Sequence, residues 1–182
     1  MAYKGRQMKI LKLVLCLTVI SAVCAGVLAS VNAVTKEAIL KIREQQTLDA
    51  AAAVMPSGVD KVEPMADGIF VGKDAAGKAA GYAVKGVSPA GYGGDIVLMV
   101  GLTPDFKIVT YKKLEAAETP GLGSNLTSPG FMKQFAGMDA SSPLSVRKDG
   151  GAVEAITSAT ITSRAVCGAI NDAKAKMEGT LK

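Results

Sequence analysis

Residues 154–163 read Glu-Ala-Ile-Thr-Ser-Ala-Thr-Ile-Thr-Ser, so five hydroxyl side chains crowd one short segment. Behind it, residues 164–177 place apolar side chains at spacings of three and four, which predicts an amphipathic helix. The hydroxyl cluster is therefore expected at a helix N-terminus. Free backbone N–H groups and the helix dipole favour an anion there, and hydroxyl groups can add hydrogen bonds to phosphate oxygens.

An ordinary helix cap is the alternative interpretation of this cluster. Ser and Thr are common at any helix start, because their side-chain oxygens accept hydrogen bonds from the first free N–H groups. The hydroxyl pattern by itself predicts either a phosphate site or a cap.

The order of residues in the cluster adds a resemblance. Thr157-Ser158-Ala159-Thr160, preceded by Glu154, resembles the flavinylation motif Asp-x-x-Ser/Thr-Gly-Ala-Thr of the FMN-binding domain family. In that family the last Thr carries FMN through a phosphoester that a separate flavin transferase installs. Glu154 stands where the family usually has Asp, and Ser158 stands where Gly is usual. A glycine there can serve a turn with positive φ or a close approach by the transferase.

Two further stretches support the same resemblance. Residues 115–123 read EAAETPGLG and look like the family's Glu-Thr-Pro-Gly-Leu-Gly loop, whose Pro-Gly pair predicts a tight turn. Residues 91–96, GYGGDI, are similar to the glycine-rich string that precedes a strand in these proteins. The resemblance implies covalent FMN on Thr160. It implies phosphate contacts from Thr157, Thr162 and Ser163, ring contacts from Glu118, Thr119 and Leu122, and a cofactor-binding motif completed by Ser158 and Ala159.

The N-terminal region has the pattern of a membrane anchor. No charged residue occurs from Leu13 through Thr35. At about 1.5 Å rise per residue, this run can span a hydrocarbon core about 30 Å thick. Four basic residues precede it, whereas Lys36 is followed by Glu37, so the positive-inside rule places the N-terminus in the cytoplasm. A cleaved signal peptide is the alternative, disfavoured because its apolar segment normally has about 7 to 15 residues.

Composition narrows the classes of function. The chain has no His and only three Cys, with no CxxC pair, which disfavours His-based catalysis and a metal or iron–sulfur site built by this chain alone. The net charge is +5, concentrated in the N-terminal lead, and four Phe and four Tyr offer little base stacking. Nucleic-acid binding is therefore disfavoured. Redox or transfer chemistry would need a bound cofactor.

The rest of the chain predicts an α+β fold. Short runs rich in Val, Ile, Tyr and Phe predict strands at residues 68–73, 79–87, 95–102 and 106–112, with two more at 144–147 and 153–156. A short helix is expected at 130–137. Turn residues at 74–78 and 103–105 join neighbouring strands, which predicts an antiparallel meander with packed helices. The expected segments are a cytoplasmic basic lead (1–12), a transmembrane helix (13–35), a helical stalk (36–56) and an FMN-binding domain (57–182).

Within the FMN-binding domain family, the short length and single anchor look most like the G subunits of Rnf electron-transport complexes. The longer C subunits of sodium-translocating NADH:quinone reductases are similar as well. The resemblance implies an electron-carrier subunit of a membrane ion-translocating ferredoxin:NAD oxidoreductase, with other membrane subunits as partners and no turnover alone. Its FMN-binding domain would lie on the periplasmic or extracellular side of the cytoplasmic membrane. Two alternatives are an assembly anchor with a vestigial flavin site and a stand-alone membrane protein that binds FMN noncovalently.

Overall fold

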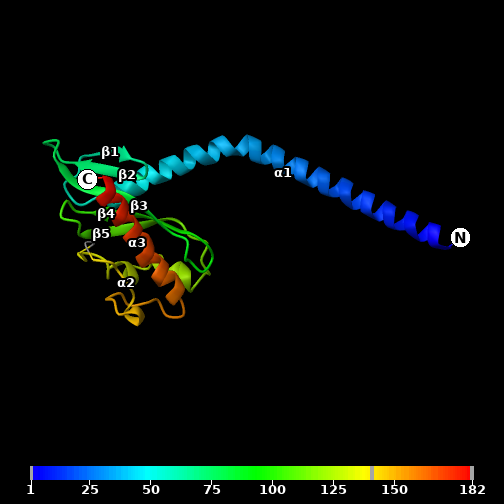
Figure 1. Ribbon diagram of the computed structural model, residues 1–182. Helices are drawn as coiled ribbons and strands as arrows, with labels where there is room; N and C mark the ends of the chain where they lie inside the picture. Colours follow the sequence, from blue (N-terminus) through cyan, green and yellow to red (C-terminus); the bar gives the residue numbers. More distant parts are fainter. Residues whose placement is uncertain (1, 140–141, 181–182) are drawn as a thin grey trace. The chain divides into compact units, whose positions relative to one another are not determined.

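The computed structural model describes residues 2–139 and 142–180, with side chains described from Leu11 onward. The chain divides into two compact units, residues 1–45 and residues 46–182. Helix α1 (Ala2–Val54) is continuous, as expected for an anchor followed by a helical stalk (Figure 1). The last turns of α1, from residue 46, belong to the second unit, whereas the sequence places them in the stalk.

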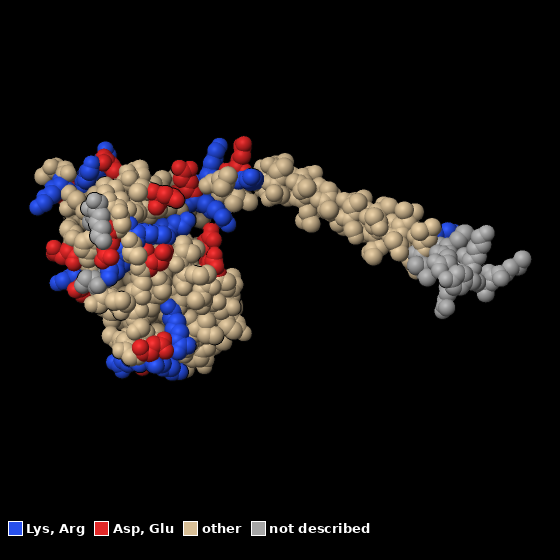
Figure 2. Space-filling view, viewed as in Figure 1, with Lys and Arg blue, Asp and Glu red and all other residues tan. Residues whose placement is uncertain are grey.

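The stretch Leu11–Val54 of α1 is long and apolar enough, by length and composition, to cross a membrane, with a mean hydropathy of 2.5 in its most apolar part. Figure 2 shows a middle portion of α1 without Lys, Arg, Asp or Glu. Large apolar side chains there are well exposed, among them Leu13 and Leu28, at 71% and 70%. Such a surface requires an apolar environment. The orientation of α1 across the membrane stays a prediction.

The second unit is built on a five-stranded sheet whose strand order follows the sequence, with every neighbouring pair antiparallel. Asp74 closes one hairpin, because its carboxylate accepts hydrogen bonds from the N–H groups of Ala76 and Lys78, each 2.9 Å long. The predicted meander and the α+β class are confirmed. The strands are β1 (Lys61–Ala66), β2 (Ile69–Lys73), β3 (Ala79–Ser88), β4 (Ile96–Leu102) and β5 (Ile108–Glu115).

Two strands differ from the sequence prediction. The sequence analysis does not predict β1. This edge strand is mostly exposed and contains Pro64, so it lacks the alternation of apolar residues that indicates a strand. β5 begins at Ile108, not at Phe106, and extends to Glu115. Phe106 has a φ of 58°, a left-handed conformation that belongs to the turn before the strand.

The helical segments are α2 (Pro129–Met132), α3 (Thr160–Thr180) and the short 3-10 helices η1 (Gly123–Thr127) and η2 (Arg147–Asp149). The predicted C-terminal helix is confirmed, but it begins at Thr160, before the predicted residue 164. The helix expected at 130–137 is confirmed only in its first turn. The strands expected at 144–147 and 153–156 are wrong, since this region forms one isolated parallel bridge, between Val146 and Val153.

Helix α3 covers one face of the sheet, and the final turns of α1 pack on the other. β4 lies between them with all seven residues buried. Glycines let both helices approach the strands closely: a Cβ at Gly86 would lie 1.9 Å from the carbonyl oxygen of Ala169 in α3. On the opposite face, a Cβ at Gly101 would lie 1.9 Å from the carbonyl oxygen of Val54. The sheet is therefore a rigid support for α3.

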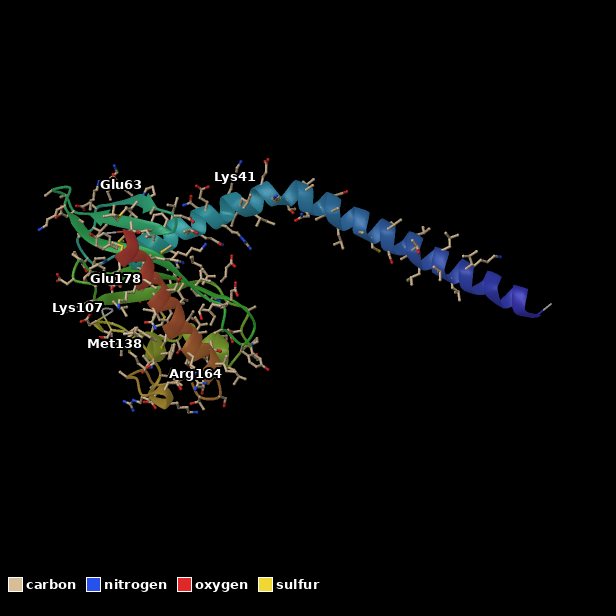
Figure 3. All side chains as sticks on the ribbon, viewed as in Figure 1. Lys41, Glu63, Lys107, Met138, Arg164 and Glu178 are labelled. Carbon is tan, nitrogen blue, oxygen red and sulfur yellow. The ribbon has the colours of Figure 1, made fainter. Side chains whose placement is uncertain are left out.

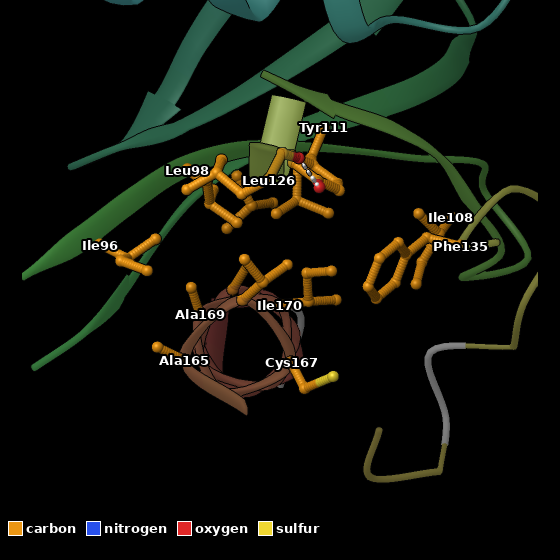
Figure 4. Close-up of a cluster of buried hydrophobic side chains, with 14 of the residues drawn as sticks. Ile96, Leu98, Ile108, Tyr111, Leu126, Phe135, Ala165, Cys167, Ala169 and Ile170 are labelled. Atoms are coloured by element: carbon orange, nitrogen blue, oxygen red, sulfur yellow. Dashed lines mark hydrogen bonds between the residues drawn. The ribbon is translucent and has the colours of Figure 1, made fainter. Parts of the chain in front are cut away.

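The main core lies between the sheet and α3 (Figure 4). Tyr111 and Phe135 meet edge to face, with ring centroids 5.5 Å apart. The buried Tyr111 hydroxyl donates a hydrogen bond to the carbonyl of Leu126, which fixes η1 against the core. Cys167 of α3 is buried in the same core, and this burial raises the pKa of its thiol to about 11. A neutral, packed thiol is the consequence.

Candidate functional site

A cavity of about 480 Å³ opens beside the N-terminal end of α3. Its lining comes from three segments far apart in the sequence. This volume falls in the range of about 300 to 1,000 Å³ that is typical of small-molecule sites. The lining residues are Tyr92 from the loop before β4, Thr119, Leu122 and Gly123 from the segment after β5, and Ser158, Ala159, Thr160, Ile161 and Thr162 around the start of α3.

Glu118 joins these three segments through hydrogen bonds. One carboxylate oxygen accepts from the backbone N–H groups of Tyr92 and Gly93, at 3.0 and 3.4 Å. The other accepts from the Thr162 hydroxyl at 2.8 Å. The packing is close, because a Cβ at Gly123 would lie 2.3 Å from this carboxylate. Glu118 thus holds the cavity's loops against the first turn of α3.

A tight turn precedes α3. The Ala159 N–H donates to the Ile156 carbonyl at 3.0 Å. Ser163 stabilises this turn, because its buried hydroxyl donates to the Ala159 carbonyl and accepts from the Ile156 N–H, each at 2.9 Å. Ser158 has a φ of 61°, in the left-handed region that non-glycine residues rarely adopt. This is the position where the family's motif usually has Gly.

We expect Ser158→Gly to raise the free energy of unfolding by about 0.5 to 1 kcal/mol. Glycine adopts a positive φ without the steric cost that an L side chain has there, which outweighs the added freedom of the unfolded chain. Thermal unfolding followed by circular dichroism would show a higher Tm. Ser128→Gly is the matched control and should lower it, since Ser128 has an extended conformation with a φ of −67°. A Tm for Ser158→Gly at or below that of the wild type would contradict the strain at this turn.

Thr160 is the first residue of α3 and is partly buried in the cavity lining. Its Oγ1 accepts a long hydrogen bond of 3.5 Å from Nζ of Lys148 in η2. Arg164 fixes η2 to α3, because two of its guanidinium nitrogens donate to the two carboxylate oxygens of Asp149, each at 2.7 Å. Hydrogen bonding to Arg164 holds the pKa of Asp149 below its ordinary value.

The structure brings together six of the residues expected at the site: Thr119, Leu122, Ser158, Ala159, Thr160 and Thr162 line the cavity. Glu118 instead contacts Thr162 and the loop before β4. The Ser163 hydroxyl is occupied by the turn, and Thr157 is exposed in a neighbouring shallow groove that also contains Glu154. The roles of all these residues toward FMN stay predictions.

Four residues at the site are absent from the sequence-based expectation: Tyr92, Gly123, Ile161 and Lys148. Tyr92 lines the cavity and lies in the glycine-rich string 91–94, which was a usable signal. Ile161 lies between two expected residues of the motif. Lys148 carries no sequence signal, because its place beside Thr160 depends on the folding of the irregular segment 142–153 against α3.

Comparisons with known proteins identify the family of this chain. Residues 91–175, which contain all the lining residues, match the family model described as FMN-binding domain. The chain is 33% identical over 177 residues to the G subunit of the ion-translocating oxidoreductase complex of Methanosarcina acetivorans, covering 91% of this chain and 93% of the relative. It is also 33% identical over 186 residues to the G subunit of the Na(+)-translocating ferredoxin:NAD(+) oxidoreductase complex of Acetobacterium woodii, covering 89% and 88%. The crystal structure of Shewanella oneidensis NqrC is similar with a TM-score of 0.48 and 23% identity, over 67% of this chain and 64% of that one.

The family match assigns residues 91–175 to an FMN-binding domain, and an apolar N-terminal helix precedes it in the chain. The chain belongs to the family of the G subunits of ion-translocating oxidoreductase complexes.

The lining of the cavity suits the chemistry of FMN. Tyr92, Leu122 and Ile161 offer aromatic and apolar surface to a flat ring system. The hydroxyls of Ser158 and Thr160, together with the free N–H groups at the start of α3, offer hydrogen-bond donors to a phosphate. The lining therefore offers both apolar surface for an aromatic ring and hydrogen-bond donors for an anion.

Proposed function

We propose that this chain is the electron-carrier subunit of a membrane ion-translocating oxidoreductase complex of the ferredoxin:NAD(+) type, with FMN attached to Thr160 through a phosphoester. The names of the relatives from Methanosarcina acetivorans and Acetobacterium woodii support the complex. The observation that carries the attachment site is the position of Thr160, whose side chain lines the cavity at the N-terminal end of α3. When bound, FMN supplies the one- and two-electron chemistry that the chain's own side chains lack.

The chain's own residues would bind, orient and shield the cofactor. Thr160 provides the oxygen of the phosphoester, and the hydroxyl of Ser158 provides a hydrogen bond to the phosphate. Tyr92 and Leu122, both exposed in the chain alone, would cover the ring and exclude water from it. The Thr162 hydroxyl donates to Glu118, so its part is to keep the loops in place. Glu118 keeps the ring-binding segment against α3, and Thr119, which lines the cavity, would contact the ring.

The same proposal assigns the membrane topology. Residues 13–35 form a single-pass anchor in the cytoplasmic membrane, with the basic lead 1–12 in the cytoplasm. Residues 36–56 form the stalk, whose turns from residue 46 pack on the sheet, and residues 57–182 form the FMN-binding domain on the periplasmic or extracellular side. The positive-inside distribution of Lys and Arg around α1 supports this orientation. The partners are the other membrane subunits of the complex and, during maturation, a flavin transferase.

Denaturing gel electrophoresis of the full chain, coexpressed with a flavin transferase, tests the attachment. We expect flavin fluorescence in the wild-type band and, in the intact mass, the addition of FMN with loss of water. Thr160→Val should abolish both signals completely, because it removes the only oxygen of that side chain. Thr180→Val is the matched control and should keep them, since Thr180 lies at the C-terminal end of α3, outside the motif and the cavity lining.

The other outcomes separate the alternatives. A wild-type chain without fluorescence and without added mass would favour an assembly anchor with a vestigial site. Flavin that copurifies with the native chain but is released on denaturation would favour noncovalent binding. Labelling that persists in Thr160→Val would move the attachment to another residue.

A further inference from the structure

We propose that Lys148 is the residue that neutralises negative charge at the Thr160 oxygen. It does so first during the reaction that attaches FMN, and afterwards by pairing with the phosphoester of the product. This inference rests on the proposed function, because it takes Thr160 as the attachment residue. The juxtaposition that carries it is the contact of 3.5 Å between Nζ of Lys148 and Oγ1 of Thr160. Lys148 comes from outside the motif, so the motif alone does not assign it.

The structure holds Lys148 in this place from both sides. Its neighbour Asp149 forms a bidentate ion pair with Arg164 in the first turns of α3, and both N···O distances are 2.7 Å. Its other neighbour, Arg147, pairs with Glu154 at 3.0 Å. Figure 3 shows Arg164 near the end of α3 where Thr160 begins the helix. Two ion pairs thus attach η2 to the segment around Thr160.

The neighbouring cations are engaged differently from Lys148. The Arg147 and Arg164 side chains each form an ion pair with a carboxylate, whereas the Lys148 ammonium contacts the Thr160 hydroxyl in the cavity lining. The lowered pKa of Asp149 comes mainly from hydrogen bonding to Arg164, and Lys148 makes only a small contribution to it. Figure 2 shows Lys and Arg beside Asp and Glu at the end of the second unit that contains η2. An ammonium group that faces a hydroxyl is available to an anion that binds at this hydroxyl.

The attachment step explains why a cation is useful here. An alcohol cannot displace hydroxide from free FMN in water, so the donor must be an activated form, and FAD carries the FMN phosphate in a pyrophosphate bond to AMP. The Thr160 O–H bond breaks, and a bond forms between its oxygen and the FMN phosphorus. The pyrophosphate P–O bond breaks, AMP leaves with the electron pair, and the proton passes to solvent. No oxidation state changes.

Lys148 would favour both the step and its product. Negative charge grows on the Thr160 oxygen as its proton leaves, and the product is a phosphodiester with one negative charge. Two opposite unit charges about 4 Å apart attract by about 1 kcal/mol in water and by more near a protein surface. Because Lys148 is exposed, we expect the smaller end of this range, which corresponds to about a fivefold change in rate.

The rate of FMN incorporation tests the inference. The full chain, purified in detergent after expression without a transferase, is incubated with purified transferase and FAD, and incorporation is followed by in-gel fluorescence and intact mass. We expect Lys148→Met to be labelled about fivefold more slowly than the wild type and Lys148→Arg at close to the wild-type rate. Lys133→Met is the matched control, because it removes the same charge from a lysine next to α2, outside the cavity lining, and it should be unchanged.

The dependence of the labelling rate on ionic strength is a second readout, which a merely structural role of Lys148 would not change. The Debye length falls from about 10 Å at 0.1 M to about 3 Å at 1 M ionic strength, so the rate ratio of wild type to Lys148→Met should shrink toward one at high salt. Equal rates for wild type and Lys148→Met at low salt would overturn the inference. Equal slowing in Lys148→Arg and Lys148→Met would overturn it too. A wild-type chain that FAD never labels would overturn the proposed function instead.

Discussion

Under the proposed function, a chain in which alanine replaces Glu118 is expected to lose most of its covalent flavin, and it should lose about 2 to 3 kcal/mol of unfolding free energy. The substitution removes the shared acceptor of the Tyr92 and Gly93 N–H groups and the Thr162 hydroxyl. Hydrogen bonds to charged groups contribute about 1.5 to 3 kcal/mol each, and the partial exposure of Glu118 lets water replace some of this. The loops would then separate from α3 and open the cavity. Flavin per chain, from intact mass, and Tm measure the two effects.

Glu118→Gln is the matched control for this prediction. Its amide oxygen can still accept from the two backbone N–H groups, and its amide nitrogen can donate to the Thr162 hydroxyl oxygen. We expect it to retain more than half of the flavin and most of the stability. Normal flavin content and an unchanged Tm in Glu118→Ala would show that the loops hold their place without this carboxylate.

Gly86→Ala is expected to be a strongly destabilising single-methyl change in the second unit, by about 3 kcal/mol. The new Cβ would lie 1.9 Å from the carbonyl oxygen of Ala169, so α3 has to move away from β3. Backbone atoms of a packed helix cannot rotate aside as a flexible side chain can. For a domain of this size, we expect Tm to fall by roughly 10 °C. Thermal unfolding followed by circular dichroism measures the change.

Gly179→Ala provides the comparison in α3. A Cβ at Gly179 meets nothing within 4 Å, and alanine favours a helix over glycine by up to about 1 kcal/mol. This variant should therefore keep or raise Tm. If both substitutions raised Tm, the close approach of α3 to Gly86 would be contradicted.

The central strands and the final helix could be predicted from the sequence because burial imposes a period on their residues. β4 is buried at every position, and α3 buries Ala165, Val166 and Ile170 on one side. β1 could not be predicted in this way, since an exposed edge strand lacks the alternating apolar residues that burial of one face requires. The apolar spacing also does not predict that α3 begins at Thr160, because Ser163 and Glu118 stabilise this first turn through contacts with other segments.

The motif residues identify part of the cavity but not its assembly. Thr160 and Leu122 could be placed near one site only through resemblance, and the structure places both in one cavity lining. The positive φ at Ser158 agrees with the expectation for a position where the family usually has Gly. Lys148 could not be foreseen, because no periodicity relates a residue in η2 to the first residue of α3.

The lining of the cavity comes from residue 92, residues 119–123 and residues 158–162, so a chain still being synthesised contains no such cavity. Thr160 reaches its place only after α3 has packed on the sheet and Glu118 has joined the loops. Under the proposed function, cofactor loading must therefore follow folding, and the attached flavin becomes a permanent record that the molecule once reached its native state. A misfolded chain would remain colourless, so after exposure to an excess of transferase and FAD the yellow fraction of a preparation would count the molecules that folded correctly.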